Sequence, residues 1–142
     1  MVGWLDSRLE SDSTFLVDLE LCQVRLHHNA VFPWIILVPK RDNVREIIDL
    51  DSKDRSVLME EMVLASRVMQ TLFNPTKLNV AALGNIVAQL HIHVIARYDN
   101  DPAWPGPVWN SVVQGDYDES EKASRINDLQ KAFLPQEAIS GH

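Results

Sequence analysis

The segment from Gln89 to Arg97, which reads Gln-Leu-His-Ile-His-Val-Ile-Ala-Arg, constrains the fold more than any other part of the chain. Every second residue is apolar, and the residues between them are a glutamine, two histidines, an isoleucine and an arginine. This period of two predicts a β-strand with one apolar face against a core and a polar face on the other side. His91 and His93 share the polar face, so both imidazole rings can act on one bound group.

The same pattern also fits a strand whose polar face is simply solvated, in which the two histidines have no chemical role. Gly84-Asn85 lies just before the strand and follows another apolar stretch, which favours a functional site. A glycine at such a position allows backbone N–H groups to approach phosphate oxygens closely. We therefore interpret the histidine strand and this loop together as a candidate phosphate site.

The run from Gln89 to Ile95 resembles the signature of the histidine triad (HIT) nucleotide hydrolases and transferases, in which three histidines alternate with apolar residues. Glutamine stands here in the first histidine position. The resemblance extends over about residues 19–109, because Val38-Pro39-Lys40 and Gly84-Asn85 fall where the family has corresponding segments. It implies an α+β fold with a HIT-like antiparallel sheet of about five strands, a long helix packed on the sheet and a C-terminal helix.

The resemblance also implies a mechanism. His91 takes the position of the nucleophile that forms a covalent nucleotidyl-histidine, and His93 that of the histidine that contacts the phosphate and the leaving group. A neutral imidazole is a competent nucleophile, and the ordinary histidine pKa lies near neutrality. The implied reaction is hydrolysis or transfer at the α-phosphate of a nucleoside phosphoramidate, dinucleoside polyphosphate or related ester, with no metal or other cofactor.

Four further residues are candidates for nucleotide binding. Gly84 and Asn85 would contact the phosphate, as the corresponding loop does in relatives. Asn29 falls where relatives have an acidic or amide residue that hydrogen-bonds the ribose hydroxyls, and Asn79 would add a polar contact. Asparagine also favours turns, so Asn29 and Asn85 have a purely structural interpretation as well.

Gln89 leaves more than one function open, because glutamine can donate and accept hydrogen bonds but cannot titrate. If the residue in this position only orients the site, the chain is an enzyme with Gln89 among its catalytic residues. If the position must move protons, the chain is a catalytically weak nucleotide-binding module. A metal-dependent hydrolase is a third possibility, with His91 and His93 as two ligands, although no Cys-x-x-Cys or His-Glu-x-x-His motif accompanies them.

The rest of the chain predicts one domain over residues 1–142, with a core at about residues 19–109. We expect a short helix from about Trp4 to Ser11, strands at 19–27 and 35–38 paired as a hairpin, and a strand at 78–83. Asp51 or Ser52 would begin a helix to about Phe73 whose apolar stripe packs on the sheet; the stripe is Leu58, Met62, Ala65, Met69 and Leu72. Residues 98–109 should form an ordered loop, residues 119–134 a final helix, and residues 136–142 a frayed end.

Composition restricts the partners. The net charge of −7 argues against a nucleic-acid polymer or an anionic membrane as the main partner, but it permits a small phosphate ligand. Cys22 is the only cysteine, so an intrachain disulfide is excluded. No signal peptide or spanning segment is evident, and we expect a cytoplasmic protein. The family resemblance, with Trp104 and Trp109 as surface aromatics, predicts a homodimer.

Overall fold

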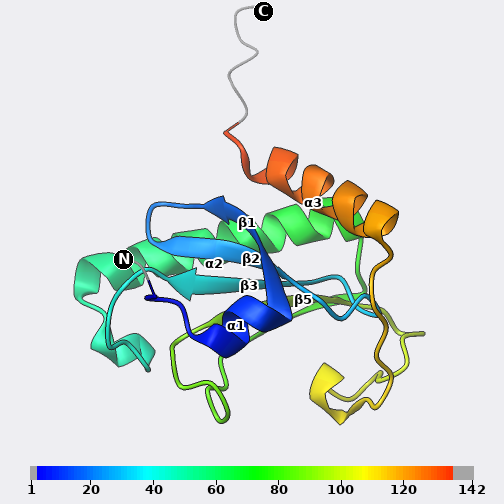
Figure 1. Ribbon diagram of the computed structural model, residues 1–142, viewed down its shortest axis with the longest axis horizontal. Coiled ribbons are helices and arrows are strands. Elements are labelled where there is room, and N and C mark those ends of the chain that lie inside the picture. Colours follow the sequence, from blue (N-terminus) through cyan, green and yellow to red (C-terminus); the bar gives the residue numbers. More distant parts are fainter. Residues whose placement is uncertain (1–2, 136–142) are drawn as a thin grey trace, which may run out of the picture.

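The computed structural model describes residues 3–135 and contains one five-stranded antiparallel sheet in the order β1-β2-β3-β5-β4 (Figure 1). The strands are β1 (Ser13–Asp18), β2 (Cys22–His27), β3 (Trp34–Pro39), β4 (Lys77–Ala81) and β5 (Ile92–Arg97). The helices are α1 (Ser7–Asp12), α2 (Ser52–Phe73) and α3 (Glu119–Phe133), with short 3-10 turns η1 (Ile47–Asp49) and η2 (Val108–Asn110). The α+β architecture predicted from the sequence is confirmed; the predicted fraying of residues 136–142 lies outside the described residues.

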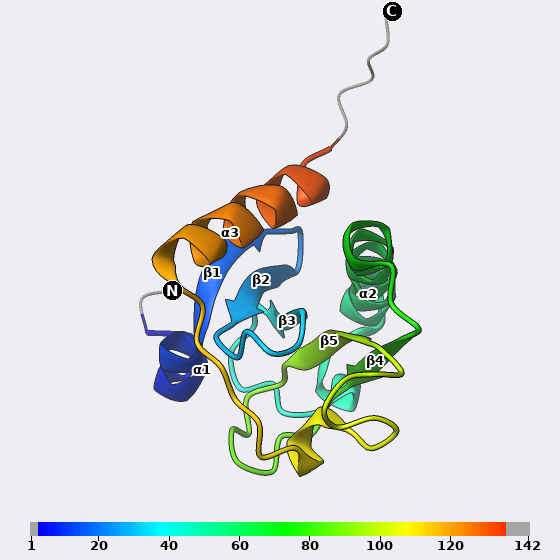
Figure 2. The same ribbon diagram turned by 90° about the vertical axis from the view of Figure 1, so that its right-hand side faces the viewer.

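Two hydrophobic clusters hold the sheet, one on each face. The larger one lies between the sheet and the helices α2 and α3, and it includes the alternating apolar residues of the histidine strand: Leu90, Ile92, Val94 and Ala96. The smaller one lies on the opposite face, where α1 and η2 contribute Leu9 and Val108. Figure 2 shows α2 and α3 on one side of the sheet, with α1 and the segment after β5 on the other. Both faces of β5 are therefore buried along its whole length.

The N-terminal half of the sheet differs from its prediction. A single strand was expected at residues 19–27, but Leu19 to Leu21 form a tight turn between β1 and β2, closed by a hydrogen bond of 2.8 Å from Leu19 N to Cys22 O. The turn contains no glycine, proline or asparagine to indicate it in the sequence. The hairpin expected with the next strand is confirmed as the antiparallel pair β2–β3.

Helix α2 begins as its capping chemistry predicts and packs on the sheet. The Asp51 side chain accepts a hydrogen bond from Asp54 N, and Asn74 ends the helix in the left-handed conformation at φ 43°. Leu58, Ala65 and Met69 are buried as the stripe predicted. Leu72 was expected in the same stripe but is 38% exposed, because it lies in the last turn of the helix.

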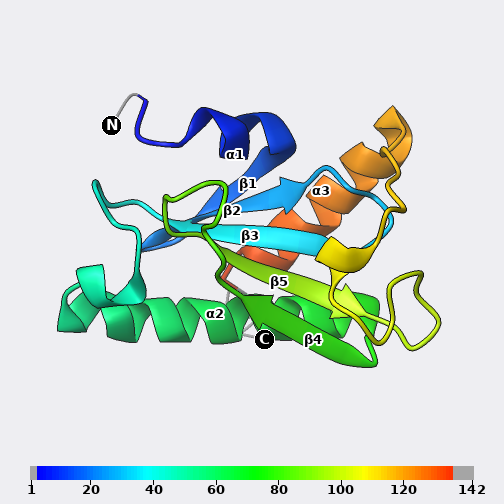
Figure 3. The ribbon, with the colours of Figure 1, turned by 90° about the horizontal axis from the view of Figure 1, so that it is seen from below.

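The strand β4 forms one edge of the sheet beside α2 (Figure 3). It ends at Ala81, earlier than the predicted residue 83, and the chain then crosses to β5 through the Gly84-Asn85 loop. None of the helices described between residues 3 and 135 combines the length and hydropathy that a bilayer span requires.

Glu61 is an unexpected buried residue on the sheet side of α2, with 6% of its surface exposed. Its carboxylate accepts hydrogen bonds from Leu21 N at 3.0 Å and Cys22 N at 2.8 Å. These bonds supply the partners that the turn between β1 and β2 needs when it is buried. The turn is therefore fixed by a helix about forty residues away in the sequence, as the separations of 40 and 39 show.

We predict that Glu61→Ala destabilises the fold by about 2–4 kcal/mol, because two buried N–H groups lose their acceptor. Glu61→Gln keeps one acceptor oxygen but turns its amide NH2 group toward the second backbone N–H, so it should cost about 1 kcal/mol less than Glu61→Ala. Urea unfolding followed by circular dichroism measures both free energies. Equal stability of the alanine and glutamine variants would show that the hydrogen bonds do not hold the turn.

Candidate active site

The two histidines of the motif lie side by side at the start of β5. His91 directly precedes the strand, and His93 lies in it opposite Ile36 of β3. Their ring centroids are 4.9 Å apart, so one phosphoryl group can contact both rings. The prediction of a shared face is confirmed, but the face is not open, since each histidine has only 7% of its surface exposed.

The protonation pattern of His91 is fixed by a backbone carbonyl. His91 Nδ1 lies 2.7 Å from Gln89 O. A carbonyl oxygen can only accept, so Nδ1 carries the proton and donates it. The neutral ring then has its lone pair on Nε2, which is the form required of a nucleophile toward phosphorus.

The protonation pattern of His93 is the reverse. Trp34 Nε1 lies 2.9 Å from His93 Nδ1. An indole nitrogen can only donate, so His93 Nδ1 accepts and its proton lies on Nε2. The pair therefore presents one nitrogen lone pair and one N–H donor, both on Nε2 atoms.

Aromatic rings surround His93. The Trp109 ring packs against it at a centroid distance of 5.2 Å, and the His27 ring stacks on Trp34 at 3.8 Å and 5°. Burial, followed by the nearby charges of His91 and His27, lowers the pKa of His93 to about 3. Burial, followed by the charge of His28, lowers the pKa of His27 to about 4. Both rings are neutral at physiological pH.

Gln89 lies outside the strand that was predicted to begin with it, and its side chain forms hydrogen bonds with the N-terminal segment and not with the imidazole rings. The side-chain oxygen accepts from Asp6 N at 2.7 Å, and the side-chain nitrogen donates to Trp4 O at 3.0 Å. The N-terminal segment is held further by Arg8, which donates to Ile86 O at 3.0 Å. Gln89 thus attaches the N-terminal segment to the loop before the histidines, while its backbone carbonyl orients His91.

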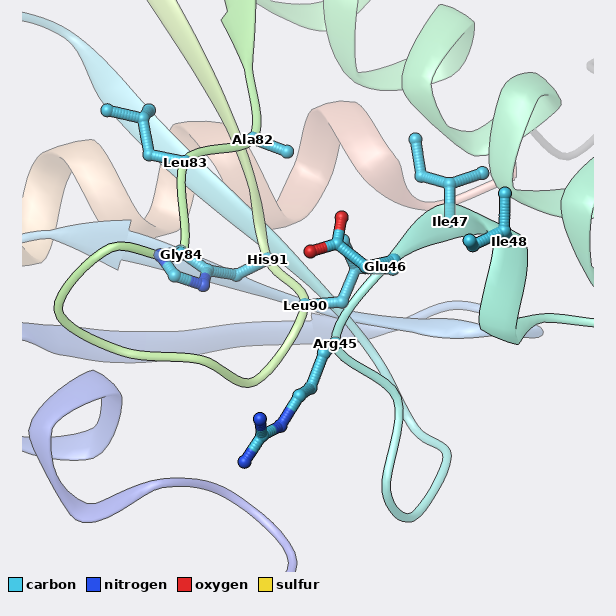
Figure 4. Close-up of a pocket in the computed structure, with 9 residues that line it drawn as sticks. All are labelled: Arg45, Glu46, Ile47, Ile48, Ala82, Leu83, Gly84, Leu90 and His91. Atoms are coloured by element: carbon cyan, nitrogen blue, oxygen red, sulfur yellow. The ribbon is translucent and has the colours of Figure 1, made fainter.

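A cavity of about 310 Å³ adjoins His91 (Figure 4). Gly84 and His91 line one side, and residues 45–48 line the other, with the charged side chains of Arg45 and Glu46. Gly84 has a φ of +76°, which a residue with a side chain adopts only under strain.

The structure engages two of the three predicted binding asparagines in internal hydrogen bonds and leaves the third exposed. Asn29 is engaged in structure, since its side-chain oxygen accepts from Val31 N at 3.1 Å and from Gly115 N at 3.3 Å. Asn79 accepts a hydrogen bond of 2.8 Å from Arg97, which commits its oxygen away from a ligand. Asn85 is exposed next to Gly84, but it is not among the residues that line the cavity. The turn interpretation therefore fits Asn29, and Asn85 stays a candidate.

The sequence analysis did not identify Trp34 or the N-terminal segment as parts of the candidate site. Trp34 belongs to an apolar run that reads as an ordinary buried strand, and nothing in its neighbourhood indicates a partner 59 residues away. For the metal hypothesis, residues 3–135 contain no group of three or more histidine, cysteine, aspartate or glutamate side chains that could hold an ion. His91 and His93 therefore gain no third ligand from that part of the chain.

The HIT domain model matches residues 8–100, and the chain therefore belongs to the HIT family. Histidine triad proteins of known structure from Bradyrhizobium japonicum and Marinobacter aquaeolei are similar to it. The first is 42% identical with a TM-score of 0.89, and the match covers 92% of this chain and 97% of the other. The second is 44% identical with a TM-score of 0.87, covering 90% and 93%.

A diadenosine triphosphate hydrolase from Plasmodium falciparum shares the fold, with a TM-score of 0.58 at 20% identity, covering 89% of this chain and 77% of the other. At that identity the likeness concerns the fold alone. No curated protein matches the chain.

The buried neutral histidines predict a loss of stability in weak acid. The folded-state pKa values of His27 and His93 lie below the ordinary 6.5, so the unfolded chain binds more protons below that pH. Each should lower the free energy of unfolding by about 1 kcal/mol between about pH 7 and pH 5.5. Urea unfolding at the two pH values measures the loss, which should be about 1 kcal/mol smaller in His27→Gln. An identical pH dependence in that variant would contradict the assignment of His27 as neutral.

Proposed function

We propose that this HIT protein is a nucleotide hydrolase or nucleotidyl transferase that acts at an α-phosphate through a covalent nucleotidyl-His91. The observation that carries the proposal is the complementary pair of imidazoles. His91 has a lone pair on Nε2 because its ring proton lies on Nδ1, which donates to Gln89 O. His93 has its ring proton on Nε2 because Nδ1 accepts the hydrogen bond from Trp34 Nε1. With ring centroids 4.9 Å apart, one nitrogen can attack phosphorus while the other donates to a phosphate or leaving-group oxygen.

In the first step, the lone pair on His91 Nε2 forms a bond to the α-phosphorus, and the bond from phosphorus to the leaving group breaks. The leaving group departs with that electron pair, and the positive charge on the ring is stabilised by Nδ1–H donating to Gln89 O. In the second step, water or another acceptor attacks the phosphorus and the P–N bond breaks. Its electron pair returns to His91 Nε2, and the proton of the attacking group passes to solvent.

The loop that contains Gly84 and Asn85 supports phosphate binding in this proposal. Gly84 lines the cavity with His91, and the absence of a side chain there would let a phosphate approach the backbone. Arg45 on the other side of the cavity adds a positive charge for a phosphate chain. The same fold in a diadenosine triphosphate hydrolase makes diadenosine triphosphate a suitable first test substrate.

The covalent intermediate is the direct test. After rapid quenching of a reaction with diadenosine triphosphate or adenosine 5′-phosphoramidate, mass spectrometry should detect added AMP on the peptide that contains His91. His91→Ala should lose the adduct and at least about a thousandfold in kcat/KM, because the nucleophile is absent. Robust turnover by His91→Ala would contradict the mechanism, and binding without turnover by the parent would favour a nucleotide-binding module.

Gln89 is proposed as a positioning residue that moves no proton. Gln89→His retains the backbone carbonyl that orients His91 and loses at most side-chain bonds to Trp4 and Asp6, so kcat/KM should stay within about tenfold of the parent. Gln89→Leu, which cannot bind the N-terminal segment by hydrogen bonds, should fall further. Steady-state kinetics separates the alternatives. A gain of about a hundredfold in Gln89→His would mean that the natural site lacks a proton-transfer group.

We also propose that the protein is a homodimer, as the family resemblance implies. Trp104 was expected at the interface, but it packs over the Arg97 guanidinium at 5.7 Å. Trp109 is 41% exposed, and apolar side chains are also exposed on α2 and the edge strand β4, where Val63 is 37% and Val80 42% exposed. Light scattering at micromolar concentration should give twice the mass of 16.1 kDa. A monomer would contradict the proposal, and Val80→Lys should weaken the dimer if the edge strand takes part.

A further inference from the structure

We infer that Trp34 holds His93 as a neutral N–H donor. The site therefore favours leaving groups that depart as stable oxyanions, such as a nucleoside diphosphate, over leaving groups that depart as amines. The inference rests on the proposed function and specifies its substrate class. Its basis is the hydrogen bond of 2.9 Å from Trp34 Nε1 to His93 Nδ1, which is buried.

Trp34 is held rigidly in its place as donor. It begins β3, pairs with Ile95 of β5 and has 6% of its surface exposed. The ring of His27 stacks on one face of the indole, with the ring planes 5° apart. His27 is held in turn, because its Nδ1 accepts a hydrogen bond of 3.0 Å from Asn29 N. The indole N–H therefore cannot swing away from His93 without disrupting this stack.

A protonated His93 is incompatible with this arrangement. An imidazolium carries N–H groups on both nitrogens, so Nδ1–H would face the indole N–H and both buried donors would lose a partner. The titratable groups that face the ring, His91 and His27, are also bases whose protonation repels a charge on His93. Burial acts in the same direction. His93 consequently donates a hydrogen bond without delivering a proton.

Three groups close to the imidazoles do not replace His93 as an acid. His91 is the attacking group, and Gln89 cannot titrate. The carboxyl of Asp6 has its pKa lowered, first by the side-chain hydrogen bond from Arg8, and so it is ionised at neutral pH. None of these groups thus supplies a proton to the leaving group, and the hydrogen bond from His93 Nε2 is the contact left to stabilise it.

An oxyanion and an amine differ in whether they need a proton in order to leave phosphorus. When the bond from phosphorus to a polyphosphate oxygen breaks, the oxygen keeps the electron pair as a stable anion, and a hydrogen bond from His93 Nε2 is sufficient. When a P–N bond to an amine breaks, the nitrogen must gain a proton before or during departure. When His93 is neutral, that proton has to come from solvent, and the departure of the amine is therefore slower.

Two probes with the same adenylyl group test the inference. Diadenosine triphosphate releases ADP, and adenosine 5′-phosphoramidate releases ammonia. Trp34→Phe removes the indole N–H and keeps an aromatic ring against His27. The ratio of kcat/KM for the triphosphate to that for the phosphoramidate should fall at least about tenfold in Trp34→Phe, because His93 can then be protonated and act as an acid.

Trp109→Phe is the matched control for altered packing. Trp109 contacts the same His93 ring at 5.2 Å, but its indole nitrogen makes no hydrogen bond to that ring among the described contacts. Its substitution should leave the ratio within about twofold of the parent. An equal fall of the ratio in both variants would show that packing, and not the hydrogen bond, sets the preference.

Nitrogen-15 NMR of the ligand-free protein gives a readout that does not depend on turnover. His93 should show a protonated Nε2 and an unprotonated Nδ1, and it should not titrate down to about pH 5, whereas in Trp34→Phe its pKa should rise. A parent protein that turns over neither probe overturns the proposed function. Turnover of both probes with an unchanged ratio in Trp34→Phe, or a His93 that titrates near neutrality, overturns this inference alone.

Discussion

The antiparallel pairing of β3 with β5 in the middle of the sheet is the constraint on which the candidate site depends. This register places Trp34 opposite Ile95 and Ile36 opposite His93, so that the indole nitrogen reaches the imidazole on the same face. A shift of one residue in β3 would turn Trp34 toward the α2 side and remove the donor from His93. The apolar residues of both strands that face α2 favour this register, because the same shift would move them out of the larger hydrophobic cluster to the opposite face.

Two hydrogen bonds then determine which ring nitrogen of His91 and of His93 carries the proton, and the chemistry of the site follows from this. A carbonyl can only accept and an indole can only donate, so His91 and His93 are held in opposite forms although they have the same side chain. Burial reinforces the neutral form of His93. In this way two equivalent imidazoles become a nucleophile and a hydrogen-bond donor without a charged residue between them.

Burying the polar face of β5 requires that its polar groups be satisfied. Arg97, which is 1% exposed, makes an ion pair with Asp101 at 2.8 Å and donates to Asn79 and Gly106, also at 2.8 Å. Its contacts order the segment after β5, and that segment then covers the histidines with Trp109. Within residues 3–135, no buried side-chain nitrogen or oxygen is left without a partner. The charge of Arg97 is therefore compensated inside the protein and not at its surface.

The amino-acid sequence was sufficient to predict the features that depend on residues close together along the chain. The period of two in the histidine segment placed His91 and His93 on one face, and the cap at Asp51 placed the start of α2, because both effects act within a few residues. The turn closed by Glu61 and the proton positions of the histidines were decided only by the tertiary structure. Their partners come from other elements, as the sequence separation of 59 between Trp34 and His93 shows. Hydrogen-bond partners that are so distant meet only once the strand register is set.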